Sequence, residues 1–339
     1  MNRPLLALVT LLLLAPTLSF AAWISPVDQK YKKRNPGLYA QIEKAGSMLS
    51  DSNGRGDIDA EALAIVQAVI VKDPGFAPAY VQRARAFSNL GYQSSGQFDP
   101  DSLAAREVDL KKALSLEPAY DYAIALMGYT KMAEGKLDEA EGFYKQAQKL
   151  KSTYPLLKSQ IAHLEFEKKN YRGAIDLAAK GFQEHQADRK VAVAYVTELI
   201  FAYEELAGNH GEELEKWQAT RTKLAPETAW YWGDRARFRL FYMHDYASAI
   251  PHGEKALSLM DYGVGRFTLA AAYYAKWADL NAKSPDSAEA AIALKRAESL
   301  SPLTQQMVNL FLSRPEMVQT GVALARRMKA PGGKPPAAR

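Results

Sequence analysis

Cysteine is absent from this 339-residue chain, and its five histidines are scattered. Without cysteine the chain forms no disulfide and offers no thiol nucleophile. No two histidines stand three or four residues apart, the spacing of paired metal ligands on a helix, and no Gly-Xaa-Ser-Xaa-Gly motif marks a nucleophilic serine. We therefore expect no catalytic residues, no metal and no cofactor, and we predict that the protein is not an enzyme.

Long apolar runs are also scarce, and the only clear one lies at the N-terminus. Leu5–Leu14 follows Arg3 and precedes small residues ending at Ala22. This pattern predicts a signal peptide over residues 1–22, cleaved before Ala22 or Trp23, and hence a periplasmic or secreted protein. The apolar core is about 10 residues long, short of the ~20 needed to cross a bilayer, so a retained anchor is the weaker alternative. We expect no membrane span in the mature chain.

Positive charge is abundant overall but rare in the body of the chain. The formal net charge is +5, and the last 14 residues alone carry five basic side chains. The remainder is close to neutral and has no clustered basic face, which argues against a nucleic-acid partner. Residues 330–339 are rich in Pro and Gly and are predicted to form a disordered basic tail. The five basic residues near the end are Arg326, Arg327, Lys329, Lys334 and Arg339.

A 34-residue period is the strongest pattern present. Ala113, Ala147 and Gly181 are 34 residues apart, as are Ala140 and Ala174. Small residues at a fixed phase of that length are typical of stacked helix pairs, which bury their apolar faces only against neighbours. The chain is therefore predicted to be an all-α, right-handed α-solenoid of about seven helix pairs with a C-terminal capping pair.

Capping residues, Gly and Pro set the expected domain organisation. Residues 23–36 are polar and Pro-bounded, and we expect an extended segment there. The repeats are expected to fill 37–302 and capping helices 303–329. The predicted pairs are 37–49 with 58–72, 77–90 with 103–116, 122–151 turning at 135–136, 154–185 turning near 170, 189–206 with 212–224, 230–260 turning at 244–245, and 265–300.

Several of these segments resemble the tetratricopeptide repeat (TPR) family. Ala77-Pro-Ala79-Tyr80 through Ala84 to Gly91 resembles a first helix of that repeat. Gly135-Lys-Leu137-Asp-Glu-Ala140 and Asp245-Tyr246-Ala247-Ser-Ala249 resemble starts of second helices. The resemblance covers residues 37–302. It implies that the first helices line a concave groove in which a protein or peptide binds.

The groove residues are inferred from the two best-aligned units. Tyr122, Ala125, Tyr129 and Met132 recur 34 residues later as Leu156, Ser159, His163 and Phe166. Spacings of three and four residues place each set on one helix stripe. Residues in these stripes are either groove anchors or packed core. From them we take Tyr122, Tyr129, Met132, His163 and Phe166 as candidate partner-binding residues.

The helix expected from Trp230 is rich in both aromatic residues and arginine. Such a helix is either the packed interior of a repeat, with arginine stems over it, or a recognition surface that could grip a peptide or a glycan. Arg235 and Phe238 are its candidate binding residues.

The acidic loop 51–59 resembles a calcium loop. Arg55 replaces an oxygen ligand, and Ala62 stands where a bidentate Glu is needed, so we expect no tight calcium binding. Asp57 or Asp59 is instead expected to cap the next helix.

The leading hypothesis is a non-enzymatic scaffold that binds a peptide or protein in the concave groove of a periplasmic TPR superhelix. The alternative is a carbohydrate-handling accessory protein of a cell-envelope or polysaccharide export assembly. A row of exposed, parallel aromatic rings would favour the glycan; mixed polar and apolar groups would favour the peptide. The sequence does not identify the partner, the pathway or the oligomeric state.

Overall fold

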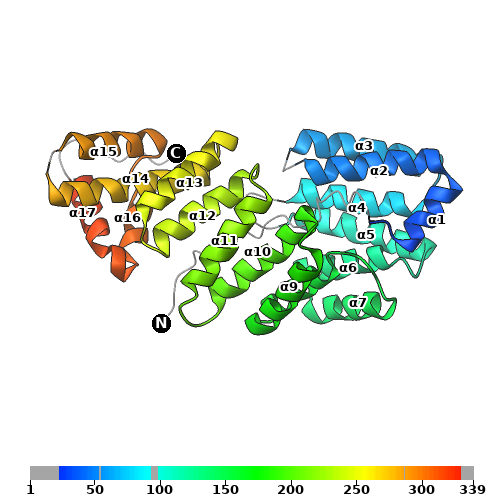
Figure 1. The fold of residues 1–339 in the computed structure, drawn as a ribbon. Coiled ribbons are helices and arrows are strands. Elements are labelled where there is room, and N and C mark those ends of the chain that lie inside the picture. The colour runs from blue at the N-terminus through cyan, green and yellow to red at the C-terminus, as the bar shows by residue number, and fades with distance from the viewer. Residues whose placement is uncertain (1–22, 53–54, 93–97, 286, 330–339) are drawn as a thin grey trace. The chain divides into compact units, whose positions relative to one another are not determined.

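The computed structural model describes residues 23–52, 55–92, 98–285 and 287–329. The chain divides into two compact units, Met1–Ala207 (unit 1) and Gly208–Arg339 (unit 2). Within the described residues both units are built from α-helices, shown in Figure 1. The predicted signal peptide at 1–22 and the predicted tail at 330–339 lie outside the described residues.

Unit 1 consists of helical pairs in which each helix packs on the next in sequence, as Figure 1 shows for α4 with α5 and α6 with α7. The two helices of a pair run in opposite directions because short turns join them. Its helices are α1 (Pro26–Arg34), α2 (Pro36–Asp51), α3 (Gly56–Lys72), α4 (Ala77–Gly91), α5 (Pro100–Leu116), α6 (Asp121–Ala133), α7 (Leu137–Lys149), α8 (Leu157–Glu167), α9 (Tyr171–His185) and α10 (Arg189–Glu205).

The 34-residue period is explained by close packing within and between these pairs. Gly128 of α6 lies against the Tyr144 ring of α7, and a Cβ atom there would be 2.6 Å from it. Gly181 of α9 lies against the Tyr195 ring of α10, where a Cβ atom would be 2.0 Å away. Larger residues at these positions would separate the helices, so small residues recur at the contact points.

The N-terminal segment 23–36 is helical, so the prediction that it is extended was wrong. Ser25 caps α1 by accepting a hydrogen bond from the Asp28 backbone amide, and Pro26 occupies the first helical turn. Basic residues in the last turn favour the helix dipole. Tyr31 is buried against the rest of unit 1, and this tertiary contact stabilises a helix too short to be stable alone.

Unit 2 has helix pairs and a C-terminal cap. The predicted fifth pair is divided, because the boundary between the units falls between its two helices, α10 and α11. The helices of unit 2 are α11 (Gly211–Leu224), α12 (Ala229–Phe241), α13 (Tyr246–Leu259), α14 (Gly263–Lys283), α15 (Ala288–Leu300), α16 (Gln305–Leu312) and α17 (Val318–Lys329), with a 3-10 turn at Pro315–Met317.

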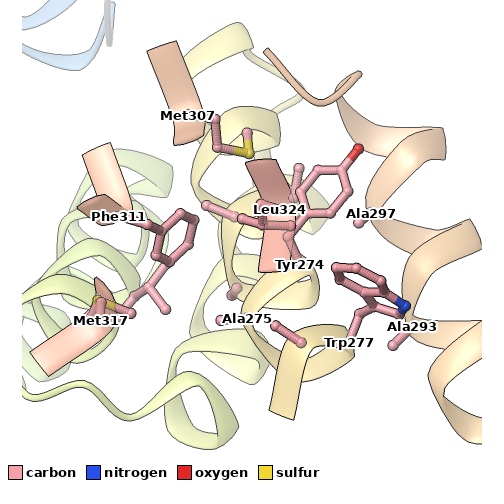
Figure 2. Close-up of a cluster of buried hydrophobic side chains, with 14 of the residues drawn as sticks. Tyr274, Ala275, Trp277, Ala293, Ala297, Met307, Phe311, Met317 and Leu324 are labelled. Atoms are coloured by element: carbon pink, nitrogen blue, oxygen red, sulfur yellow. The ribbon is translucent and has the colours of Figure 1, made fainter. Parts of the chain in front are cut away.

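The last four helices of unit 2 enclose an apolar core (Figure 2). Tyr274 and Trp277 of α14 lie among side chains from α15, α16 and α17. Phe311 and Leu324, from the two capping helices, are fully buried there. The cap therefore covers apolar surface that the last repeat would otherwise expose.

The start of α3 differs from the expected cap. Arg55 stands at the N-cap position without a side-chain hydrogen bond, so neither Asp57 nor Asp59 caps the helix. Asp57 pairs with Arg55 at 2.9 Å, and Asp59 is buried and accepts a hydrogen bond from Asn89. Packing onto α4 decides the role of Asp59. The loop residues 53–54 lie outside the described residues.

Candidate functional site

Four of the five candidate groove residues of unit 1 are buried. Tyr122, Tyr129 and Met132 lie on α6 and His163 lies on α8, each with less than a tenth of its surface exposed. Phe166, near the end of α8, is half-buried. The stripes predicted from their spacing exist, but most of their side chains pack against other parts of unit 1.

Tyr129 packs beside a buried arginine that sequence reasoning missed. The Arg106 guanidinium of α5 is 5.0 Å from the centre of the Tyr129 ring, and it donates to the Leu126 carbonyl at 3.2 Å. Burial lowers the pKa of Arg106, while neighbouring tyrosines oppose that shift. The ring and the guanidinium therefore support one another in the interior, and Tyr129 acts as a core residue.

His163 takes part in a buried ion pair. Its Nδ1 atom is 2.9 Å from Glu198 of α10, and its Nε2 atom is 3.6 Å from Glu167. Burial opposes the charged imidazolium, but Glu198 and then Glu167 outweigh burial and raise the pKa of His163. The pair joins α8 to α10, and Glu198 was not among the residues singled out from the sequence.

A half-buried group of aromatic side chains surrounds Phe166, and we call it the aromatic patch. Its members are Phe166, Tyr171 and Phe201, with ring centres 5.6 Å (Phe166–Tyr171) and 6.1 Å (Phe166–Phe201) apart. Burial, then Glu205 and Glu167, raise the pKa of Tyr171, which places carboxylates beside the patch. The patch therefore offers an apolar surface flanked by negative charge.

The candidate residues of unit 2 are structural. Phe238 is buried and stacks on Tyr242 with ring centres 5.2 Å apart. Arg235 binds Glu215 at 2.7 Å, and Arg239 binds the same carboxylate at 2.5 Å. These ion pairs join α12 to α11, so the arginine-rich helix forms the packed interior of a repeat. Arg235 and Phe238 lie in a different unit from the aromatic patch.

Other kinds of site were also sought. Among the described residues, no group of three or more His, Asp or Glu side chains is arranged to hold a metal ion. In the same part of the chain, no helix has the length and apolarity required to cross a bilayer.

Comparison with known proteins identifies the fold. No family model matches the sequence, and no curated protein is significantly similar to it. Solved structures are similar: the match to a chain of the crystal structure of the APC/C hetero-tetramer Cut9-Hcn1 has a TM-score of 0.53 and 17% identity. That match covers 80% of this chain and 45% of the other, so this chain spans less than half of its length.

Two further structures extend this likeness. Human IFIT1, solved as a dimer with PPP-AAAA, matches over 89% of this chain and 69% of its own, with a TM-score of 0.56 and 17% identity. TTC0263, a thermophilic TPR protein of Thermus thermophilus, is 22% identical over 51% of this chain and 87% of its own, with a TM-score of 0.41. The chain has the TPR-type helical-repeat solenoid fold, in agreement with its 34-residue helix pairs.

Proposed function

We propose that the protein is a non-enzymatic interaction scaffold that docks a peptide segment of a partner protein on the aromatic patch. The observation that carries the proposal is the half-buried state of Phe166, Tyr171 and Phe201 at the end of α8, the start of α9 and the end of α10. Helical-repeat proteins present such surfaces across adjacent repeats, where an extended segment meets several of them at once.

The charges around the patch define the chemistry of the partner. Glu205 is exposed and Glu167 partly so, and both act on Tyr171. A segment with an apolar or aromatic anchor flanked by lysine or arginine complements this surface. Its binding weakens as salt is raised, because exposed charges are screened. The glycan alternative gains no support, since Tyr242 is the single aromatic residue among the exposed large hydrophobic side chains of the described residues.

The location proposed for the scaffold is the periplasm or the exterior, and its support is the pattern of residues 1–22. Mass determination of the purified protein tests it. A chain beginning at Ala22 or Trp23 supports export, whereas residues 1–21 retained in a membrane fraction contradict cleavage.

Site-specific photo-crosslinking tests the docking surface. A benzophenone residue in place of Phe201 is expected to crosslink a partner protein, and the crosslink should weaken when Glu205→Gln is added. The control replaces Val71 of α3, an 81% exposed residue remote in sequence from the patch. Equal crosslinking from positions 201 and 71 would contradict the proposed surface.

A further inference from the structure

Residues 23–34, which we call the strap, cross three successive turns that join one helix pair of unit 1 to the next. Each turn carries a buried aromatic residue shortly before the following first helix. We call these turns the rim. They span residues 73–76, 117–120 and 150–156, and their aromatic residues are Phe76, Tyr120 and Tyr154.

The beginning of the strap contacts the last of the three turns. The Trp23 ring centre is 5.2 Å from that of Tyr154 and 5.3 Å from that of Tyr122. The Trp23 indole Nε1 donates a hydrogen bond to Thr153 Oγ1 at 3.1 Å. Trp23 therefore covers Tyr122, one of the residues that the sequence placed in the groove.

The middle of the strap contacts the second turn through a buried carboxylate. The Tyr120 hydroxyl donates to Asp28 at 2.8 Å, and the Ser25 hydroxyl donates to the other carboxylate oxygen at 2.5 Å. All three side chains are buried. Hydrogen bonds to hydroxyl donors satisfy this carboxylate and fix its position on the rim.

The end of the strap contacts the first turn. The Tyr31 ring centre is 5.0 Å from that of Phe76, and the Tyr31 hydroxyl lies 3.1 Å from the Gly75 carbonyl. The Arg34 guanidinium lies 5.5 Å from the Phe76 ring centre. The strap thus meets the three turns in reverse order, with one anchoring group or pair for each turn.

The contacts of the strap are few, and several of them are exposed. The Lys30–Glu117 and Lys32–Glu43 ion pairs have exposed lysines, and such pairs hold weakly in water. The strap continues into α2 through a single residue, Asn35. A segment held by a few anchors opens more readily than a packed helix pair. Its opening uncovers a row of aromatic side chains, a surface suited to an apolar segment.

We propose that the rim is a peptide-binding surface occupied by the chain's own strap, and that a partner segment with the same chemistry displaces the strap. That segment carries an aromatic residue, a carboxylate, a second aromatic residue and an arginine in this order. The rim lies at the N-terminal ends of the first helices, whereas the aromatic patch lies near the C-terminal ends of α8 and α10. The proposal therefore goes beyond the docking surface above, and its test requires no cellular partner.

A labelled synthetic peptide of residues 23–34 is the probe. It is titrated into the full chain and into the full chain carrying Trp23→Ala and Tyr31→Ala, which loosens the strap. We expect at least tenfold tighter binding to the loosened chain, because its own strap competes less. Adding Tyr120→Phe should weaken peptide binding at least threefold, since it removes the hydroxyl that Asp28 accepts from.

The matched control is Tyr274→Phe, which removes a hydroxyl bonded to the Ser301 carbonyl in unit 2 and should leave peptide binding unchanged. Equal binding to both chains, or no binding to either, would overturn the proposal. If the loosened chain does not fold, hydrogen exchange of the unaltered chain decides. Strap amides that exchange at least tenfold faster than those of α6, and faster still in Tyr120→Phe, support a displaceable strap. Equal protection of the strap and α6 would show an integral helix.

Discussion

The core around α6, α8 and α10 and the core around α14–α17 are built from different side chains. The first contains the buried charged residues Lys131, His163 and Glu198. The second consists of alanines around Tyr274 and Phe311, with apolar residues from both capping helices (Figure 2). One core thus depends on pairing of charges, and the other depends on burial alone.

This difference separates the parts that hold the fold together from the parts offered for binding. Burial of apolar surface stabilises without regard to pH, whereas a buried ion pair must recover its desolvation cost through good geometry. Lys131 shows such geometry, since its ammonium lies 2.7 Å from Glu107 and 3.1 Å from Glu134. The aromatic patch and the strap both lie in the unit with the polar core.

The largest effect is expected in the apolar core. Phe311→Ala removes a fully buried ring between α16 and its neighbours and should lower the free energy of unfolding of unit 2 by about 3–5 kcal/mol. The loss should be the same at pH 5 and pH 8, as chemical denaturation would measure. Ile292→Ala, at a 69% exposed position of α15, should change stability by less than about 0.5 kcal/mol. Equal losses would show that the cap is loosely packed.

The next effect sharpens the contrast through pH. Burial raises the pKa of Asp28 from 3.8 to about 6, against the lowering effect of its hydrogen bonds to Ser25 and Tyr120. The folded state therefore holds this proton more tightly than the unfolded state, so the stability contribution is greatest below pH 3.8. It falls between pH 3.8 and 6, by about 3 kcal/mol at most.

Asp28→Asn has no proton to lose and should lack this decline. Urea unfolding of both proteins at pH 4 and pH 7 measures the difference. Parallel pH dependence of the two proteins would show that Asp28 is not held in a buried environment and would weaken the description of the strap.

The sequence predicted the helix pairs well because small residues at a fixed period reflect contacts between neighbours in the chain. The turn expected at 135–136 contains Gly135, whose φ of 75° favours glycine. The strap was missed because its contacts, such as that of Trp23 with Thr153, span about a third of the chain. The signal for a helix was nevertheless present, since Ser25, Pro26 and Asp28 form a typical N-terminal cap.

The candidate site was harder to predict than the fold. A stripe at spacings of three and four shows that Tyr129 and Phe166 share equivalent faces but not what covers them. Tyr129 is covered because Arg106 reaches it from the second helix of the preceding pair. Phe166 stays half-buried beside Phe201. Burial depends on neighbouring repeats, so residues predicted to be equivalent took different roles.

A smaller effect is expected where glycine allows close helix packing in unit 1. Gly181→Ala places a methyl group against the Tyr195 ring and should destabilise by about 1–3 kcal/mol, because the ring has no free space to enter. Gly142→Ala is the control, since nothing lies within 4 Å of its new Cβ atom on α7. Alanine there should stabilise by up to ~1 kcal/mol through helix propensity. Thermal unfolding compares the two, and a harmless Gly181→Ala would contradict the tight approach of α9 and α10.

The smallest expected effect is a change of slope with pH at the His163–Glu198 pair. The pKa of His163 in the folded protein is raised above its ordinary 6.5, so the stability that the pair contributes is complete below pH 6.5. It is lost as pH rises through the folded value. Glu198→Gln removes the carboxylate 2.9 Å from the imidazole and should flatten this part of the stability profile. Glu167→Gln, which removes the carboxylate at 3.6 Å, should flatten it less. Titration of the His163 ring by NMR in the three proteins measures the order directly. If Glu198→Gln left the pKa unchanged, the polar core would owe its stability to packing, as the apolar core does.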